Sequence, residues 1–358
     1  MSAPSARYVQ LGKSGLRISV PIVGAASYGN PKWAATEEST QWVLDEEHAL
    51  PILKAAWDRG INTIDTANVY SNGDSERVIA KFIEKYQIPR DEIIILTKCY
   101  GIAAKGADHD ILTQPLIPVM RQRREYVNWM GLSRTAIWNA VENSLARLNT
   151  SYIDLYQIHR FDPDTPPEET MKALHDLVEA GKVRYIGASS MRAWQFALLN
   201  EVAERHGWTK FVSMQDEYSL LYRRSLHAMY LQEREMIAYC KYHGIGLIPW
   251  SPLSGGALAR PLNAEETPRW KSFNAYGVNT QHEIDAEIIK RVDEVAKKRG
   301  WAMSQVALAW VARTVDSPIV GFNSIKRVDQ GIVDGELTDE EAKYLEEPYV
   351  PKPVRGHP

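Results

Sequence analysis

Short apolar runs alternate with amphipathic segments along nearly the whole chain, and this repeat limits the fold more than any other feature. The runs lie at 21–26, 61–65, 93–98, 154–159, 183–190, 211–215, 245–250 and 317–321. After the first run, Leu50, Leu53 and Trp57 share one face of a predicted helix that stops at Gly60. Eight strand–helix units in 358 residues predict an α/β fold, a single (β/α)8 TIM barrel.

No linker or change in composition divides the chain, so residues 1–358 are expected to form one domain. Residues 7–19 predict an N-terminal β-hairpin, and residues 338–358 are expected to form a C-terminal tail. A doubly wound sheet is the alternative. It has less support, because no Gly-x-Gly-x-x-Gly follows a strand, and the spacing from Gly24 to Gly29 continues with Asn-Pro rather than the Lys-Ser/Thr of a P-loop.

Two long stretches lack the helical and strand periodicities. They cover 100–132, after the third strand, and 254–281, after the seventh. Long irregular connections in a compact domain are usually functional loops or disordered segments, so we expect long substrate loops here. Ser133 is a predicted N-cap for the helix that follows the first stretch.

Composition excludes several classes of protein. A formal net charge of −3 argues against nucleic acid as the main partner, and the basic cluster at 121–124 is too short to change this. The N-terminus lacks an apolar signal core and no apolar run reaches ~18 residues, so no membrane association is expected. Cys99 and Cys240, the two cysteines, have no metal-ligand spacing. We therefore expect a cytoplasmic protein without a metal, as a monomer or small homo-oligomer.

Polar side chains follow successive strands of the predicted barrel. Asp65 and Tyr70 follow the second strand, Lys98 ends the third and His159 ends the fourth. Chemistry in such barrels gathers at the C-terminal ends of the strands. Any one of these residues alone would more often be structural: a core histidine, a solvated lysine or a packed tyrosine. Their coincidence at neighbouring strand ends favours a catalytic site.

These residue types suit the reduction of a carbonyl group, which needs a hydride at carbon and a proton at oxygen. An unpaired carboxylate at a buried strand end is costly, so Asp65 should meet a cation, and Lys98 is the candidate. A nearby ammonium stabilises a phenolate and makes a phenol a better general acid, which is the role expected of Tyr70. His159 can donate a hydrogen bond to the carbonyl oxygen.

The amino-acid sequence around these residues resembles that of the aldo-keto reductase superfamily. The resemblance rests on four stretches: Gly60-Ile-Asn-Thr-Ile-Asp-Thr-Ala-Asn-Val-Tyr70, Asp154-Leu-Tyr-Gln-Ile-His159, Gly181-Lys-Val-Arg-Tyr-Ile-Gly187 and Pro249-Trp-Ser-Pro-Leu253. It runs from the hairpin to the last helix. The chain looks most like fungal members of the branch with aryl-alcohol dehydrogenases and polyketide-pathway reductases.

The resemblance implies an NADP(H)-dependent reductase of a small carbonyl compound, with Asp65, Tyr70, Lys98 and His159 as catalytic residues. Ser189, Ser190 and Gln215 would hold the carboxamide, and Trp250 would stack on the nicotinamide, although a packed core tryptophan is the alternative. The remaining cofactor contacts implied are Gly24, Ala25, Asp65, Ser251, Leu253, Gly255, Gly321, Asn323 and Arg327. Relatives that prefer NADPH usually carry Arg or Lys where this chain has Asn323. Because Lys326 and Arg327 follow closely, NADPH is still expected over NADH.

The substrate pocket is expected between the irregular stretches. Trp33, Tyr100 and Trp129 are the candidates, among aromatic residues that also include Tyr126, Trp270, Phe273 and Tyr276. An aromatic mouth favours flat or apolar carbonyls over small sugars. The alternative, that these side chains pin the loops to the barrel, has equal support. The segment 223–230 resembles an insertion, and no role is assigned to it.

Two other functions were weighed against a reductase. The first is a nicotinamide-binding regulatory subunit that keeps the barrel and serves a partner protein; the tetrad alone does not exclude it. The second is glycoside or metal-assisted hydrolysis. A glycosidase needs two facing carboxylates, but the seventh strand ends in Trp250 and Ser251, and only Asp65 and His159 could serve a metal.

Overall fold

The computed structural model describes residues 5–33, 42–223, 234–275 and 283–353. Its centre is a sheet of eight parallel strands in the order β10-β3-β4-β5-β6-β7-β8-β9. The strands are β3 (Ile22–Gly24), β4 (Thr63–Asp65), β5 (Ile94–Cys99), β6 (Ile153–Ile158), β7 (Val183–Ser189), β8 (Ser213–Gln215), β9 (Gly246–Leu247) and β10 (Ile319–Val320). Each lies in or across one of the apolar runs of the sequence, and the predicted α/β barrel is confirmed.

Backbone hydrogen bonds close the sheet into a barrel. The N–H of Ile319 donates to the carbonyl of Pro249 at 2.9 Å, and the N–H of Asp316 donates to that of Leu247 at 3.0 Å. Both bonds join the β10 side of the sheet to the β9 side. The carboxyl ends of all the strands therefore meet at one rim.

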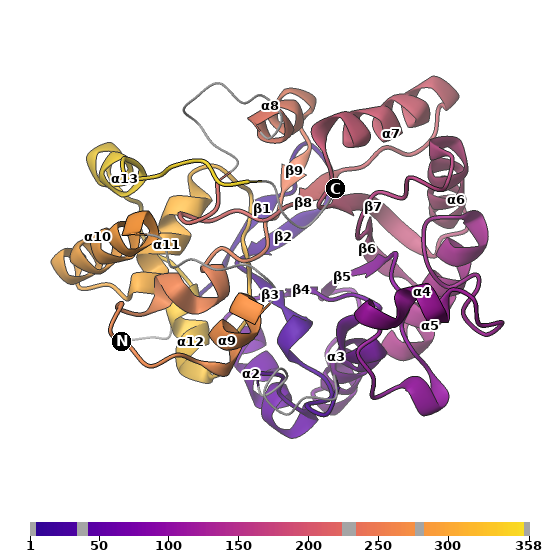
Figure 1. Ribbon diagram of the computed structural model, residues 1–358, viewed down its shortest axis with the longest axis horizontal. Coiled ribbons are helices and arrows are strands. Elements are labelled where there is room, and N and C mark those ends of the chain that lie inside the picture. Colours follow the sequence, from indigo (N-terminus) through magenta and orange to yellow (C-terminus); the bar gives the residue numbers. More distant parts are fainter. Residues whose placement is uncertain (1–4, 34–41, 224–233, 276–282, 354–358) are drawn as a thin grey trace.

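Helices surround the strands (Figure 1). They are α2 (Glu46–Asp58), α3 (Asp74–Lys85), α4 (Ile117–Met120), α5 (Arg134–Leu148), α6 (Pro167–Glu179), α7 (Ala193–His206), α8 (Arg234–His243), α9 (Pro268–Ala275), α10 (Glu283–Arg299), α11 (Met303–Ala312), α12 (Ile325–Gly331) and α13 (Asp339–Glu346). Ser133 caps α5 as predicted, accepting from the N–H of Ala136 at 3.2 Å. Gly60 follows the end of α2 with φ 82°, a left-handed conformation that favours glycine.

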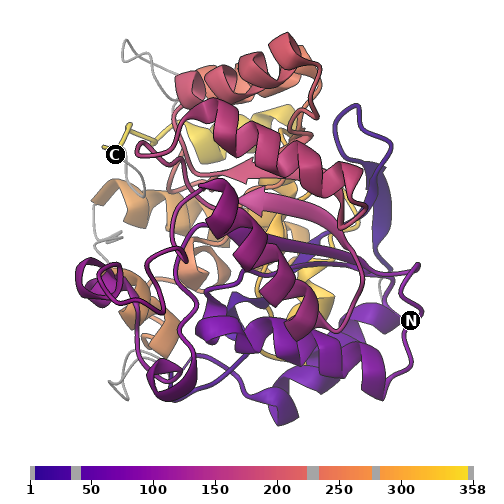
Figure 2. The same ribbon diagram turned by 90° about the vertical axis from the view of Figure 1, so that its right-hand side faces the viewer.

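The N-terminal hairpin, β1 (Arg7–Gln10) and β2 (Arg17–Val20), covers the end of the barrel opposite the carboxyl rim. Leu11 and Ile18 from the hairpin are buried in one cluster with Leu96 and Leu155 of the strands. Figure 2 shows the hairpin (indigo) at one end of the molecule and the segment 100–132 (purple) at the other. The barrel floor is thus sealed, and the opposite rim is left for chemistry.

One stretch expected to be irregular and one expected to be a C-terminal tail contain helices. The segment 254–281 includes α9, whose first turn is capped by Thr267 through the N–H of Trp270 at 3.2 Å. The segment 338–358, expected as a tail, begins with α13, where Thr338 and Glu341 form a capping box. Both helices have only eight residues, too short for a periodic apolar pattern to stand out.

The segment 100–132 has a small core of its own. Ile102, Ala104, Met120 and Tyr126 are buried together, and Trp129 packs against them. Its regular structure is limited to α4 and single turns. The interior of the segment is therefore filled by its own side chains rather than by those of the barrel.

Among the helices described, none has the length and apolarity to cross a membrane.

Candidate active site

Asp65 ends strand β4 inside the rim, with 2% of its surface exposed. Its Oδ2 accepts a hydrogen bond from Nζ of Lys98, which lies in the neighbouring strand β5, at 2.6 Å. The same ammonium donates to the carbonyl of Thr66 at 2.8 Å. The cation expected for Asp65 is thus present, and both charges of the pair lie inside the barrel.

The charge of Lys98 is maintained despite complete burial. Burial lowers the pKa of its ammonium, but the Asp65 carboxylate and then Tyr70 raise it by more, so the pKa lies above its ordinary value. The ammonium therefore stays protonated at neutral pH. A fixed positive charge inside a water-poor barrel is available to any group that approaches it.

Tyr70 is the group that approaches the Lys98 ammonium. Its phenol oxygen lies 3.5 Å from Nζ of Lys98, and the ammonium lies 5.1 Å from the centre of the ring. Tyr70 begins a tight turn in which Ser71 and Asn72 have φ of 47° and 49°. The Asn72 amide fixes this turn by donating to the carbonyls of His109 at 2.7 Å and of Ile111 at 2.8 Å.

His159 lies beside Tyr70, directly after strand β6. Its backbone N–H donates to the carbonyl of Cys99 at 2.8 Å, and its ring is edge-on to that of Tyr70 with centroids 5.9 Å apart. Burial lowers the pKa of the His159 imidazole well below its usual range, and the charges of Arg160 and Lys98 lower it further. The ring is therefore neutral at physiological pH, and it can donate a hydrogen bond without carrying a charge.

The second oxygen of Asp65 is held by two amides. Gln215, from strand β8, donates through Nε2 to Oδ1 at 2.8 Å, and Gln157, from β6, donates at 3.0 Å. Nε2 of Gln215 also lies 3.0 Å from Oε1 of Gln157. Gln157 was not predicted from the sequence, although it stands two residues before His159 and so faces the same side of the strand.

Residues at the ends of β7 and β9 form a second part of the site. Ser189 donates through Oγ to the carbonyl of Gln215 at 2.7 Å, and Trp250 donates through Nε1 to Oγ of Ser190 at 3.1 Å. The hydroxyl of Ser190 also lies 3.3 Å from Oγ of Ser189, and Oε1 of Gln215 receives no hydrogen bond from the described residues. A hydroxyl that can turn to a ligand and a free amide oxygen suit a carboxamide such as that of nicotinamide.

The chain then makes consecutive left-handed turns. Ser251, Ser254, Gly255 and Gly256 have φ of 54°, 46°, 64° and 101°. The Oγ atoms of Ser254 and Ser219 lie 2.7 Å apart and hold this turn to the chain after β8. Successive residues in such conformations can direct backbone N–H groups to one side and form a concave anion site. Leu253, in the same turn, is partly buried.

Arg260 lies beyond this turn. Arg260 donates to the carbonyls of Gly256 at 3.2 Å and Glu265 at 3.3 Å. Burial lowers the pKa of its guanidinium, and so does the nearby charge of Arg327. Like charges held close together favour an anion between them. Arg327 was predicted from the sequence and Arg260 was not; Arg260 lies seven residues after Leu253, in a stretch expected to be irregular.

The remaining expected cofactor residues lie at the ends of strands β3 and β10, which pair in parallel. Gly24 and Ala25 are buried, whereas Gly321 and Asn323 are exposed. A Cβ on Gly321 would lie 3.8 Å from the carbonyl oxygen of Gly24, so the two glycines are neighbours. They lie on the rim, but Asn323 brings no charge to it.

The aromatic candidates for the substrate pocket occupy different surroundings. Trp33 is partly buried, with an indole N–H that has no hydrogen-bond partner in the described part of the chain. Tyr100, also partly buried, directly follows β5. Trp129 packs edge-on against the buried Tyr126, and Nζ of Lys105 lies 3.7 Å from the centre of its ring. Tyr126 and Trp129 therefore hold the 100–132 segment together.

Some expectations fall on parts of the chain that are not described. Tyr276 lies outside the described residues, and the same holds for the side chain of Phe273 and for 224–230 of the insertion-like segment. Arg223, at the start of that segment, is described. Its N–H donates to the phenol of Tyr349 at 2.9 Å, and its guanidinium donates to the carbonyl of Glu346 at 2.9 Å.

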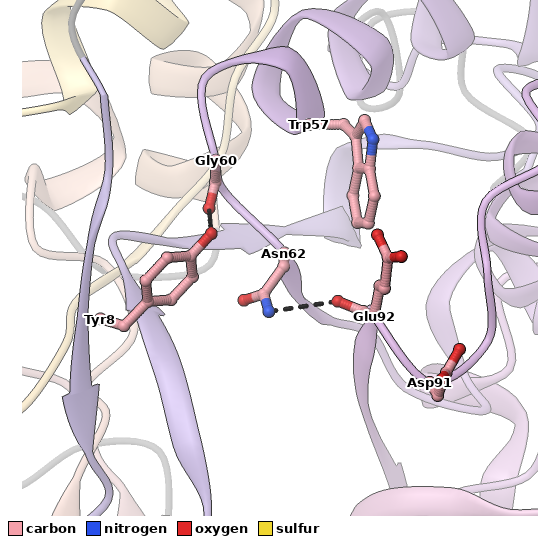
Figure 3. Close-up of a pocket in the computed structure, with 6 residues that line it drawn as sticks. All are labelled: Tyr8, Trp57, Gly60, Asn62, Asp91 and Glu92. Atoms are coloured by element: carbon pink, nitrogen blue, oxygen red, sulfur yellow. Dashed lines mark hydrogen bonds between the residues drawn. The ribbon is translucent and has the colours of Figure 1, made fainter.

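A separate cleft of about 360 Å3 lies at the hairpin end of the barrel (Figure 3). Tyr8, Trp57, Gly60, Asn62, Asp91 and Glu92 line it. The phenol of Tyr8 donates to the carbonyl of Gly60 at 2.7 Å, and the Asn62 amide donates to that of Glu92 at 3.2 Å. These residues precede β4 and β5 or belong to β1, so the cleft faces away from Asp65 and Lys98.

Within the described ranges, no three His, Cys, Asp or Glu side chains are grouped so as to hold a metal ion.

Comparison with known proteins gives one consistent result. A model of the aldo/keto reductase family matches residues 22–349. The chain is 51% identical to the aldo-keto reductase dtxS3 of Metarhizium robertsii, over 98% of this chain and 93% of that protein. It is 46% identical to versiconal hemiacetal acetate reductase of Aspergillus parasiticus and 45% identical to a putative aryl-alcohol dehydrogenase, AAD16, of Saccharomyces cerevisiae, in each case over 98% of both chains.

Proposed function

The chain belongs to the aldo/keto reductase family of oxidoreductases, and we propose that it uses NADPH to reduce an aromatic or apolar aldehyde or ketone to the alcohol. Bound NADPH supplies a hydride for the carbonyl carbon. Tyr70 supplies the proton for the carbonyl oxygen, so that the C=O double bond becomes a C–O single bond as new C–H and O–H bonds form. The remaining residues of the site bind, orient and tune these two partners.

One observation carries the proposal: Nζ of Lys98 lies between Asp65, at 2.6 Å, and Tyr70, at 3.5 Å. As Tyr70 loses its proton, negative charge develops on a phenol oxygen next to a buried ammonium. Low local polarity strengthens this attraction. Asp65 keeps the ammonium charged and in position, and so supports the proton transfer without touching the substrate.

His159 is proposed to orient the carbonyl. Its ring is neutral and adjacent to Tyr70. A neutral imidazole can donate an N–H hydrogen bond to the substrate oxygen while Tyr70 donates its proton to the same atom. A charged imidazolium would compete as the acid, and the lowered pKa of His159 prevents this.

The residues of the rim fit a nicotinamide dinucleotide phosphate. Ser190 offers a donor and Gln215 an acceptor for the carboxamide, and Trp250, fixed by its bond to Ser190, offers a ring for stacking. The turn from Ser251 to Gly256 would bind the pyrophosphate. Arg260 and Arg327 would bind the 2′-phosphate, which compensates for Asn323 and supports NADPH over NADH.

Aromatic or apolar carbonyl compounds are the proposed substrates. Trp33 and Tyr100 would face the substrate, with Trp129 supporting the loop beside them. The names of two relatives refer to an aryl alcohol and to versiconal hemiacetal acetate, which agrees with a preference for bulky carbonyl compounds. Two free, buried cysteines, Cys99 and Cys240, support a reducing compartment, and we propose a cytoplasmic monomer or small homo-oligomer.

The experiment is to follow NADPH oxidation with a panel of aldehydes, for the wild type and for Tyr70→Phe. Repeated turnover by the wild type and its loss in the variant would support the assignment. Transfer of a single hydride without further turnover would instead favour a nicotinamide-binding regulatory subunit. Unchanged turnover in Tyr70→Phe would contradict the assignment of Tyr70 as the proton donor.

A further inference from the structure

Gln157 is a fully buried glutamine in an otherwise apolar part of strand β6. It is in register with Lys98 on one side and with Gly187 on the other. A Cβ on Gly187 would lie 2.2 Å from Oγ of Ser213 and 3.3 Å from Cγ of Gln157, so the glycine leaves room for both side chains. A buried amide costs free energy unless all of its polar atoms are paired, which calls for a reason.

Gln157 and Asp65 together fix the orientation of a second amide, that of Gln215. A carboxylate can only accept, so both Gln157 and Gln215 must turn Nε2 toward Oδ1 of Asp65. The other hydrogen on Nε2 of Gln215 is then directed to Oε1 of Gln157, 3.0 Å away. Both donors of Gln215 are occupied, and its Oε1 is turned away from this triangle.

We infer that Gln157 is a positioning residue for the nicotinamide ring, and this rests on the proposed function. By holding Nε2 of Gln215, it presents Oε1 of Gln215 as an acceptor for the NH2 of the cofactor carboxamide. Ser190 donates to the carbonyl oxygen of the same carboxamide from the other side. The carboxamide sets the rotation of the ring, so Gln157 controls which face is turned to the substrate without touching the cofactor.

A purely structural role for Gln157 makes a different prediction. If the amide only satisfies Asp65, its loss weakens every ligand of the site to a similar degree. If it orients Gln215, its loss weakens only those ligands that donate to Oε1 of Gln215. The two roles are separated by a pair of cofactors that differ in this one group.

The test compares NADPH with the reduced 3-acetylpyridine analogue, in which a methyl group replaces the carboxamide NH2. Dissociation constants are measured by isothermal titration calorimetry for the wild type, Gln157→Met, Gln215→Met and the double variant. Methionine keeps the unbranched shape and removes the hydrogen bonds. Gln305→Met is the matched control, because Gln305 is a partly buried glutamine that accepts from the N–H of Ala302 at 2.9 Å on α11.

The wild type should bind NADPH more tightly than the analogue. Gln157→Met should reduce this ratio by about two- to tenfold, the range of one net hydrogen bond, with little change for the analogue. Gln305→Met should keep the wild-type ratio. The double variant should lose no more of the ratio than Gln215→Met alone, because the two glutamines act through one hydrogen bond.

An unchanged ratio in Gln157→Met, or losses that add up in the double variant, would overturn the inference while leaving the proposed function intact. If the wild type binds no NADPH, both the inference about Gln157 and the proposed function are contradicted. The ratio compares two ligands on the same protein, so partial unfolding cancels. If Gln157→Met does not fold, Gln157→Asn, which is too short to reach both partners, is measured with the same expectation.

Discussion

Nζ of Lys98 and the phenol oxygen of Tyr70 lie 3.5 Å apart, although the two residues come from different strand–helix units. The strand register fixes Lys98, and the turn after β4 fixes Tyr70. This distance therefore depends on the barrel strands and on the hydrogen bonds by which Asn72 ties the turn to His109 and Ile111 of the 100–132 segment. It sets the expectations for variants of both residues.

Tyr70→Phe should lower turnover by at least ~10²–10⁴-fold, because the variant lacks the general acid while keeping the ring. NADPH binding should survive, since the phenol is proposed to act on the substrate and not to bind the cofactor. Initial rates of NADPH oxidation and calorimetric titration measure the two effects. Tyr152→Phe is the control: it also removes a phenol hydrogen bond, to the carbonyl of Arg90 at 3.3 Å, but leaves turnover at the wild-type level.

Lys98→Met should destabilise the fold by about 3–5 kcal/mol, because it leaves the buried Asp65 carboxylate without its counter-charge. Urea unfolding measures the loss as a lower midpoint with the same slope. Lys54→Met breaks the exposed pair with Asp58 and should cost no more than about 0.5 kcal/mol. Equal losses in the two variants would contradict a buried ion pair at Lys98.

The pKa of His159 lies well below its usual range, chiefly because of burial, and this gives a pH dependence of stability. Below about pH 6.5 the unfolded imidazole takes up a proton that the native one refuses, so the free energy of unfolding should fall as the pH drops. The drop between about pH 7 and pH 5 should be smaller in His159→Asn than in the wild type.

His48 provides the control of opposite sign. Its hydrogen bond to Asp45 raises the pKa of its imidazole, so its contribution is present at low pH and is lost as the pH rises through that raised value. His48→Asn should therefore not reduce the loss of stability on acidification. A wild-type slope in His159→Asn would show that His159 is charged in the native protein.

Arg327→Ala should raise the Kd for NADPH by about tenfold or more, the loss expected for a charge-assisted hydrogen bond to phosphate. The Kd for NADH should hardly change, because NADH lacks the 2′-phosphate. Lys297→Ala, at an exposed site of α10 paired with Asp293, serves as the charge-matched control. If the wild type binds NADPH and NADH with equal affinity, or binds NADH more tightly, the predicted preference for NADPH is contradicted.

Aromatic aldehydes should show a higher kcat/KM than glyceraldehyde. Trp33 and Tyr100, the proposed pocket residues, would offer apolar surface to the substrate, and a flat ring gains more from burying that surface than a small polyol does. A panel of aldehydes at fixed NADPH gives the order directly. The reverse order would refute the aromatic pocket, and Trp33→Ala should narrow the difference if Trp33 lines it.

Much of this architecture could be predicted because the barrel strands are buried on both faces. Apolar runs such as 93–98 and 154–159 stand out for that reason, and the side chains that leave them must meet at one rim. The position of Asp65 also predicted that it pairs with a cation, since a carboxylate at a buried strand end requires one. Such predictions depend on burial and charge, which can be read one residue at a time.

Gln157 and Arg260 could not be predicted in the same way. Gln157 is meaningful only through its register with Lys98 and its distance from Gln215, which belongs to another strand. Arg260 acquires its role from Arg327, far along the chain, and an arginine in an irregular segment gives no sign of such a neighbour. Both depend on pairings that exist only after the barrel has closed.

The small core of the segment 100–132 has a practical consequence for protein engineering. Because the side chains of this core pack on one another, the segment can be exchanged as a unit while the barrel is kept. Its attachment includes Asn72, which donates to His109 and Ile111 and accepts from the N–H of Ala104 at 3.1 Å. A graft from a relative that keeps these bonds should change which carbonyl compounds are admitted while the machinery for hydride and proton transfer stays as it is.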